Sequence, residues 1–167
     1  RQYMLGDSLL VAPIFDESGT VNYYLPEGKW THLLNNEVRE GGRWYTDSYD
    51  YFSLPLYIRE NTLLARVSGA DKPDYDYSEN VTLHLYELSN NSEATCKIPN
   101  LDGETILTAS AKLDNKKLTL TLSKPTKGVS FVLHGIDSIV SADKATFTKV
   151  DEGMQVTPEG TTVVINL

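Results

Sequence analysis

Cysteine is almost absent from this sequence, since Cys96 is the only one among 167 residues. A single thiol excludes an intramolecular disulfide and any cysteine-rich metal site. Free cysteines mostly behave as small apolar residues, and the neighbours Thr95 and Lys97 give only weak support for a reactive thiol of low pKa. We therefore expect Cys96 to be a partly buried residue in a strand.

Long apolar runs and an excess of basic residues are also missing. No segment approaches the roughly 18 apolar residues that indicate a transmembrane helix, so we expect no membrane partner. Lys and Arg number 15 against 23 Asp and Glu, a net charge of −8, which argues against a nucleic acid partner. Arg1 opens the sequence without an initiator methionine or a charged leader, so no targeting segment is visible.

Helical periodicity is lacking as well. No stretch keeps apolar residues at i, i+3, i+4 and i+7 for long enough to form a substantial helix. Turn residues instead recur at intervals of roughly 8–12 residues, a spacing typical of all-β sandwiches or barrels. With 40% hydrophobic and 23% charged residues, the composition is that of a globular protein.

The most apolar stretch is residues 2–15 (QYMLGDSLLVAPIF). Its continuous run Leu9-Leu10-Val11 predicts a strand buried on both faces, and Gly6-Asp7 ahead of it marks a turn. Chain ends usually lie at the surface of a domain. A buried strand so close to Arg1 therefore leads us to expect that the natural chain continues upstream.

The rest of the first half reads as short strands separated by turns. Thr20–Leu25 (TVNYYL) and residues 29–34 (KWTHLL) flank Pro26-Glu27-Gly28. Because proline and glycine favour a tight turn, we predict that these two strands pair as an antiparallel hairpin. Further strands are expected around residues 37–39, 51–54 and 56–66.

The second half begins after a change of composition. Residues 67–80 (VSGADKPDYDYSEN) contain almost no aliphatic side chains, which indicates a domain boundary. Val81–Tyr86 then alternates, with Val81, Leu83 and Leu85 on one face and Thr82, His84 and Tyr86 on the other. We expect later strands at residues 106–113 and 118–122, around a hairpin turn at Asp114-Asn115, and at 129–133, 145–150 and 161–165. The predicted fold is all-β, two β-sandwich modules in series.

Three segments carry a family resemblance: residues 2–15, residues 23–33 (YYLPEGKWTHL) and residues 52–65 (FSLPLYIRENTLLA). Their order and spacing resemble the C-terminal region of glycoside hydrolase family 31, and the bacterial α-xylosidase branch is the most similar. DYDY at residues 74–77 also resembles that branch. The resemblance implies a barrel exit at residues 1–7, a proximal C-terminal β-sandwich at 8–66, a linker at 67–73 and a distal β-sandwich at 74–167.

The resemblance also implies an activity that this chain would not perform alone. The family hydrolyses α-glycosidic bonds with retention in a TIM barrel, using two aspartates as nucleophile and general acid/base. No match to the nucleophile segment occurs in residues 1–167, so we expect no catalytic residue, no cofactor and no metal here. The implied role is to buttress the catalytic barrel of the same polypeptide, which hydrolyses terminal α-xylosyl or α-glucosyl residues. The compartment is left open, with the cytoplasm favoured because a single cysteine suits a reducing environment.

Two other roles stay open, a stand-alone carbohydrate-binding module and a structural module that mediates homo-oligomer contacts. The best surface candidate is residues 44–51 (WYTDSYDY), because aromatic faces beside carboxylates can hold an oligosaccharide. The alternative is that Trp44 and Tyr51 pack in the core or against the barrel. The residues expected to contact either sugar or barrel are Trp30, His32, Trp44, Tyr45, Tyr49 and Tyr51.

Other groups of chemically active residues favour structural explanations. Asp47 with Asp50 is one of many carboxylate pairs that 23 acidic residues make inevitable. The three histidines are far apart in sequence and lack a second ligand at metal spacing, so His32, His84 and His134 are expected to be structural. A calcium loop drawn from Asp71, Asp74, Asp76 and Glu79 lacks the order of a known loop motif, and a solvated linker is favoured.

Overall fold

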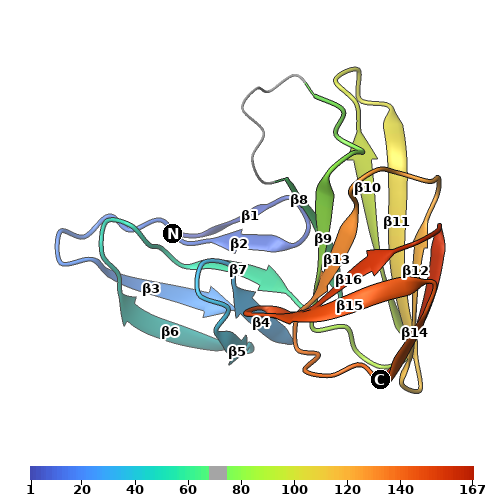
Figure 1. The fold of residues 1–167 in the computed structure, drawn as a ribbon. Coiled ribbons are helices and arrows are strands. Elements are labelled where there is room, and N and C mark those ends of the chain that lie inside the picture. The colour runs from blue at the N-terminus through green and yellow to red at the C-terminus, as the bar shows by residue number, and fades with distance from the viewer. Residues whose placement is uncertain (68–74) are drawn as a thin grey trace. The chain divides into compact units, whose positions relative to one another are not determined.

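The computed structural model describes residues 1–67 and 75–167, and it divides the chain into two compact units, Arg1–Glu60 and Asn61–Leu167. Every regular element in the described residues is a β-strand, as Figure 1 shows. None of those residues belongs to a helix that could cross a membrane. Each unit has two sheets around its own core, so the predicted all-β fold with two sandwich modules in series is confirmed.

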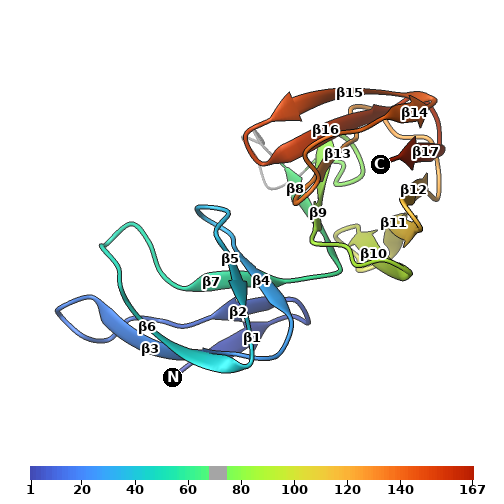
Figure 2. The same ribbon diagram turned by 90° about the horizontal axis from the view of Figure 1, so that it is seen from below.

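The first unit combines a five-stranded sheet with a two-stranded one. The larger sheet has the order β1-β2-β7-β4-β5 and the smaller pairs β3 with β6 (Figure 2). The bounds are β1 (Tyr3–Leu5), β2 (Leu9–Val11), β3 (Thr20–Leu25), β4 (Lys29–His32), β5 (Val38–Glu40), β6 (Arg43–Ser48) and β7 (Leu56–Arg59). The core consists of Leu10, Ala12, Val21, Tyr23, Leu25, Trp30 and Tyr57.

The opening stretch forms a hairpin inside this unit. Tyr3–Leu5 pairs antiparallel with Leu9–Val11, around a turn in which Gly6 has a φ of 64°. β2 lies between β1 and β7, and Leu10 and Val11 are buried, as the continuous apolar run predicts. The sequence predicts that residues 1–7 lie outside the sandwich, as a barrel exit. In the structure β1 is instead the edge strand of the larger sheet.

The predicted hairpin between Thr20–Leu25 and residues 29–34 is wrong. β3 pairs with β6, and β4 pairs with β5 and β7 in the other sheet. Pro26-Glu27-Gly28 is therefore a corner between two sheets. Gly41 approaches this corner so closely that a Cβ there would lie 1.6 Å from the carbonyl oxygen of Pro26. Its amide donates a hydrogen bond to the carbonyl oxygen of Gly28 at 2.7 Å.

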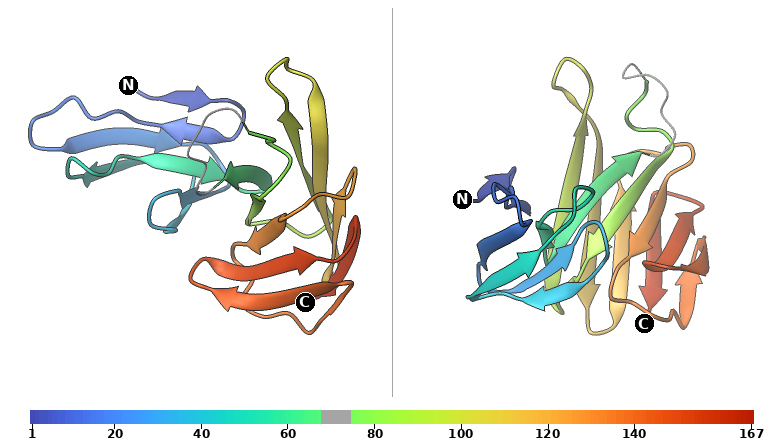
Figure 3. Two further views of the ribbon diagram at one scale, coloured as in Figure 1. Left: turned by 45° about the horizontal axis from the view of Figure 1, so that its top comes forward. Right: turned by 90° about the vertical axis from the view of Figure 1, so that its left-hand side faces the viewer.

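The second unit consists of two five-stranded sheets, β10-β11-β12-β17-β14 and β15-β16-β13-β9-β8 (Figure 3). Their inward side chains form the larger of the two cores, which includes Leu83, Leu107, Leu120, Phe131 and Val163. The bounds are β8 (Thr62–Val67), β9 (Val81–Tyr86), β10 (Ser92–Pro99), β11 (Thr105–Asp114), β12 (Lys117–Leu122), β13 (Ser130–Leu133), β14 (Ser141–Asp143), β15 (Ala145–Val150), β16 (Gly153–Pro158) and β17 (Thr162–Asn166).

Two features of this unit differ from the sequence expectations. β8 pairs with β9, so residues 61–66 belong to the second unit, whereas the first module was predicted to extend to residue 66. The cause is that Leu63 extends the apolar face of β9 into the second core. The predicted linker lies, from residue 68 onward, outside the described residues. The β11–β12 hairpin is confirmed, with its turn at Asn115-Lys116, one residue later than predicted.

Candidate functional site

Two of the predicted contact residues, Trp30 and His32, lie in the core of the first unit. Each side chain is only 1% exposed, because β4 is an interior strand of the larger sheet. The indole nitrogen of Trp30 donates a hydrogen bond to the carbonyl oxygen of Pro26 at 2.8 Å. A ring nitrogen of His32 lies 3.0 Å from the carbonyl oxygen of Leu54. Neither ring has a face left for a sugar or another domain.

Tyr45 and Tyr49 are half-buried and face inward. The ring of Tyr45 stacks on the ring of Tyr23 at 5.8 Å, and its hydroxyl donates to the carbonyl oxygen of Glu40 at 2.7 Å. The ring of Tyr49 stacks on His32 with centroids 5.9 Å apart. These contacts attach β6 and the residue that follows it to the rest of the unit, so both tyrosines serve the fold.

Strand alternation sends Trp44 to the opposite side of β6, where it is 70% exposed. Its ring lies 5.6 Å from the ring of Tyr24, its partner across the β3–β6 pair. Four uncharged polar side chains continue along the same face as cross-strand pairs. We call this surface the β3–β6 outer face; it consists of Thr20, Asn22, Tyr24, Trp44, Thr46 and Ser48.

Tyr51 and Phe52 lie in the loop after β6, and both are almost fully exposed. Asp50 shapes this loop, because its carboxylate accepts hydrogen bonds from the amide of Phe52 at 3.0 Å and the hydroxyl of Ser53 at 3.1 Å. The structure therefore contradicts packing of Trp44 and Tyr51 in the core of their own unit. Phe52 is a further exposed aromatic that was not singled out, although it stands next to Tyr51 in the sequence.

The beginning of the chain carries a second apolar surface. Tyr3, Met4, Leu5 and Phe15 are all exposed, and we call this set the N-terminal apolar surface. The exposed residues flank the buried strand Leu9–Val11 within the most apolar stretch of the sequence.

Side-chain contacts connect this surface to the outer face. The Gln2 side-chain amide donates to the carbonyl oxygen of Tyr24 at 2.8 Å and accepts from its amide at 2.7 Å. The guanidinium of Arg1 lies 5.8 Å from the ring centre of Phe15. A continuous series of contacts therefore leads from Phe15 through Arg1, Gln2 and Tyr24 to Trp44.

Asp47, a carboxylate that could pair with Asp50 by sequence, belongs instead to a polar network beneath the outer face. Arg39 donates to Asp47 and to the hydroxyl of Tyr23, which itself donates to Asp47. Because that donation uses the only proton of the Tyr23 hydroxyl, Tyr57 is the donor in the 3.0 Å contact between the two phenols. Although partial burial raises the pKa of Asp47, hydrogen bonds from Tyr23 and Arg39 hold it below its ordinary value. Asp47 is therefore an ionised structural group, unsuited to act as a general acid.

In the second unit the structure brings together two histidines that are distant in sequence. Nδ1 of His84 lies 3.0 Å from Nε2 of His134, and the ring of Tyr86 stacks on His134 at 4.1 Å. Burial lowers the pKa of each histidine to about 4. Among the described residues, no group of three or more potential ligands could hold a metal ion.

The remaining candidates have structural positions. Asp71 and Asp74 lie outside the described residues, and one carboxylate oxygen of Asp76 accepts from the amide and hydroxyl of Ser78. Cys96 is half-buried in β10, as expected, and burial raises the pKa of its thiol. A raised pKa keeps the thiol protonated and unreactive.

Two family models together cover most of the chain. Residues 76–167 match the model described as "Alpha-xylosidase YicI, C-terminal domain", and residues 1–64 match the "Glycosyl hydrolase family 31 C-terminal domain".

Curated relatives agree with these matches. The chain is 40% identical over 90 residues to alpha-xylosidase XylQ of Lactiplantibacillus pentosus, covering 52% of this chain and 12% of that protein. It is 32% identical over 108 residues to alpha-glucosidase 2 of Bacillus thermoamyloliquefaciens, covering 62% and 13%. The chain thus spans only about an eighth of the length of these relatives.

The fold also matches solved structures. A GH31 dextranase of Flavobacterium johnsoniae, complexed with isomaltotriose, aligns over 99% of this chain and 26% of its own with a TM-score of 0.82 and 17% identity. The GH31 alpha-xylosidase of Xanthomonas citri aligns over 80% of this chain and 16% of its own, with a TM-score of 0.60 and 17% identity. At this identity the two alignments show the fold alone.

Proposed function

The chain belongs to the C-terminal domains of glycoside hydrolase family 31, and we propose that its first unit supports the catalytic barrel of a retaining α-glycosidase of the α-xylosidase type. In this proposal the barrel lies in the same polypeptide ahead of Arg1. The barrel contributes the two carboxylates, about 5 Å apart in retaining enzymes. This chain contributes the surface on which the barrel rests.

The observation that carries the proposal is the N-terminal apolar surface. Tyr3, Leu5 and Phe15 are each more than half exposed, although they belong to the most apolar stretch of the sequence. Exposed apolar surface typically marks a contact with another protein surface, and Tyr3 and Leu5 share one face of β1. In the proposal, the barrel rests on these side chains.

The β3–β6 outer face extends the proposed contact. Gln2 joins β1 to Tyr24, and Tyr24 contacts Trp44. Trp44 supplies a large aromatic surface without charge, and burying such a side chain contributes about 1.5–3 kcal/mol or more. The buried tyrosines and Arg39 beneath this face keep β3 and β6 in place.

The test uses the intact polypeptide that contains this chain. We expect its coding sequence to continue ahead of Arg1 into a barrel with an aspartate nucleophile. Replacing Leu5 and Phe15 together by Ser should lower the melting temperature of the intact polypeptide by several degrees. The same change should leave the melting temperature of the isolated chain unaffected, because both side chains are exposed there.

Val140→Ser is the matched control, since Val140 is as exposed as Phe15 but lies in the second unit. It should leave both melting temperatures unchanged. An upstream sequence without a barrel, or an intact polypeptide that is insensitive to the Leu5 and Phe15 replacements, would contradict the proposal. A dimer of the isolated chain that these replacements dissociate would favour a homo-oligomer contact instead.

A second function is favoured by the chemistry of the β3–β6 outer face. The pairs Asn22–Thr46 and Thr20–Ser48 are hydrogen-bonded beside Trp44 and carry no charge. An aromatic ring next to neutral polar groups suits a saccharide chain. If this face binds sugar, Trp44→Ala should lower the heat of binding measured by calorimetric titration of the isolated chain with isomaltotriose. If it contacts the barrel, Trp44→Ala should leave any measured heat unchanged.

A further inference from the structure

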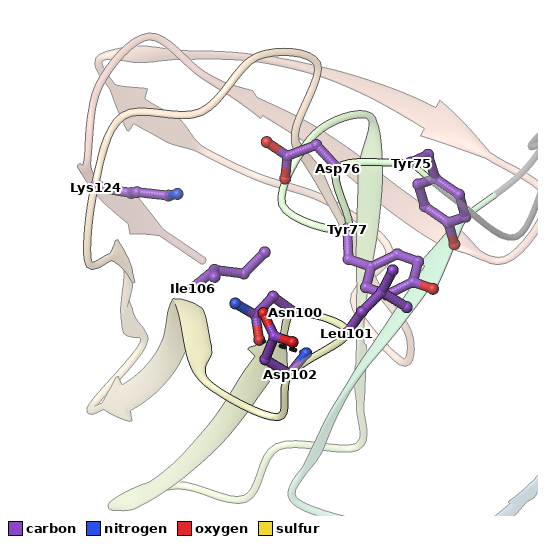
Figure 4. Close-up of a pocket in the computed structure, with 8 residues that line it drawn as sticks. All are labelled: Tyr75, Asp76, Tyr77, Asn100, Leu101, Asp102, Ile106 and Lys124. Carbon is purple, nitrogen blue, oxygen red and sulfur yellow. Dashed lines mark hydrogen bonds between the residues drawn. The ribbon is translucent and has the colours of Figure 1, made fainter.

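A pocket of about 350 Å³ lies in the second unit, and its lining residues belong to neither of the surfaces described in the first unit. Three loops form it: residues 75–80 before β9, residues 100–104 between β10 and β11, and residues 123–129 after β12. Figure 4 shows Asp76 on one side of the pocket and Asn100 with Asp102 on the other. Its size is at the lower end of the range of about 300–1,000 Å³ for small-ligand pockets.

Apolar and aromatic groups line part of this pocket. Leu101 is 70% exposed, Tyr75 is exposed at its rim and Ile106 is half-buried. The ring of Tyr75 meets that of Tyr77 edge to face, with centroids 4.5 Å apart at 84°. This contact limits the orientations open to the Tyr75 ring. The pocket thereby offers apolar surface for the carbon-bound hydrogens of a ligand.

The 100–104 loop is organised around the side chain of Asn100. Its carbonyl oxygen accepts hydrogen bonds from the amides of Asp102 at 3.1 Å and Glu104 at 2.8 Å. Gly103 has a φ of 84°, and its amide donates to the main-chain oxygen of Asn100 at 3.1 Å. The backbone of Asp102 is therefore set before any ligand arrives. Pre-organisation of this kind lowers the entropic cost of binding.

Polar groups at the rim retain capacity for hydrogen bonds. Within the described residues, the carboxylate of Asp102 and the ammonium of Lys124 form no hydrogen bond or ion pair with the protein. Asp76 uses one oxygen for Ser78 and keeps the other. The pocket thus combines two acceptors and one donor with an apolar lining.

From this combination we propose that the pocket binds a small neutral saccharide. Sugar hydroxyls both donate and accept hydrogen bonds, which suits carboxylates beside an ammonium group, and the sugar ring offers an apolar face to Tyr75 and Leu101. Two carboxylates disfavour an anion. Lys124 disfavours a bare cation, and no group of three potential ligands occurs among the described residues. The choice of saccharide as the ligand rests on the proposed function. The pocket and the polar groups at its rim are observed independently of that function.

The experiment is a titration of the ¹⁵N-labelled chain, followed by NMR, with isomaltotriose and with methyl α-xyloside at millimolar concentration. At least one should shift the amide signals of residues 75–77 and 100–104. Asp102→Ala should weaken binding about tenfold, because a hydrogen bond to a charged group contributes about 1.5–3 kcal/mol and 1.4 kcal/mol is a factor of ten. Tyr75→Ala should also weaken it, because it removes apolar surface from beneath the sugar ring. The Leu101→Ser variant, altered at a side chain that is 70% exposed, provides a second test without risk to folding.

Val140→Ser is the control and should bind the saccharide like the unaltered chain. The proposal is overturned by an absence of saccharide shifts at millimolar concentration. It is equally overturned by shifts that survive Tyr75→Ala, Asp102→Ala and Leu101→Ser, or by shifts that Trp44→Ala removes. Calcium chloride is a separate arm, and calcium shifts at Asp102 without saccharide shifts would overturn it too. None of these results touches barrel support, which is measured by the melting temperature of the intact polypeptide without sugar.

Discussion

Nδ1 of His84 and Nε2 of His134 lie 3.0 Å apart in the second unit, although 50 residues separate them in sequence. β9 and β13 pair in parallel, with Leu85 opposite Leu133, so His134 follows its strand directly beside the end of β9. The amide of His134 donates to the carbonyl oxygen of Leu85 at 2.9 Å and continues the pairing by one residue. Both imidazoles are almost completely buried, and Arg66 adds to the effect of burial on their pKa values.

This pair predicts that acid destabilises the second unit. The pKa of each histidine in the folded protein is about 4, below its ordinary value of 6.5, so the unfolded chain binds more protons between these values. The free energy of unfolding should therefore fall as the pH drops from about 6.5 towards about 4. Urea unfolding monitored by circular dichroism at several pH values measures this dependence.

Replacement of both histidines by Gln should flatten that pH dependence. His32→Gln is the control, because His32 lies in the first unit and its replacement should leave the second unit unchanged. Tryptophan fluorescence separates the units, since both tryptophans, Trp30 and Trp44, are in the first. If the second unit is equally stable at about pH 4.5 and about pH 7, the prediction is contradicted.

The contact between Arg39 and Asp47 predicts a large effect on the first unit. Their side chains are 16% and 26% exposed, so solvent screens the ion pair only in part. Asp47→Ala removes the acceptor of the Tyr23 hydroxyl and one acceptor of Arg39, which keeps its ion pair with Glu37. The free energy of unfolding, followed by tryptophan fluorescence, should fall by about 1.5–3 kcal/mol. Asp137→Ala removes an exposed ion pair with Lys149 and should cause no measurable change.

Gly41 predicts a steric effect at the corner between the two sheets of the first unit. A Cβ at this position would lie 1.6 Å from the carbonyl oxygen of Pro26, so the backbone itself must move. Gly41→Ala should lower the free energy of unfolding of the first unit by at least about 2 kcal/mol. Gly160→Ala has open space around it and should leave stability unaffected. Equal urea midpoints for the two variants would refute this account.

The hairpin between β11 and β12 predicts a stabilising replacement. Asn115 and Lys116 have φ values of 45° and 70°, and a side chain with a Cβ is strained in that region. Lys116→Gly should raise the free energy of unfolding of the second unit by about 0.5–1 kcal/mol, because Asn-Gly is the preferred pair in such turns. Lys117→Gly, one residue later and inside β12, should lower it instead. Thermal unfolding followed by circular dichroism compares the two variants.

Sequence reasoning reached the fold class and part of the candidate surface. The alternation of β9 and the hairpin of β11 and β12 were predictable, because a period of two shows directly which side chains share a face. Trp44 and Tyr51 are exposed, and their contact with sugar or barrel stays a prediction. The burial of Trp30 and His32 could not be predicted, because composition alone does not show that β4 lies inside a sheet with strands on both sides.

The amino-acid sequence by itself determined that this protein is all-β, that it has two modules, and that it resembles the C-terminal region of one glycosidase family. Those properties depend on local periodicity, turn residues and motifs. Only the tertiary structure decided that β3 pairs with β6, that His84 meets His134, and that three loops enclose a pocket beside Tyr75. The physical reason is that a strand's side-chain pattern specifies which face is buried, while its partner is chosen by the packing of the whole unit.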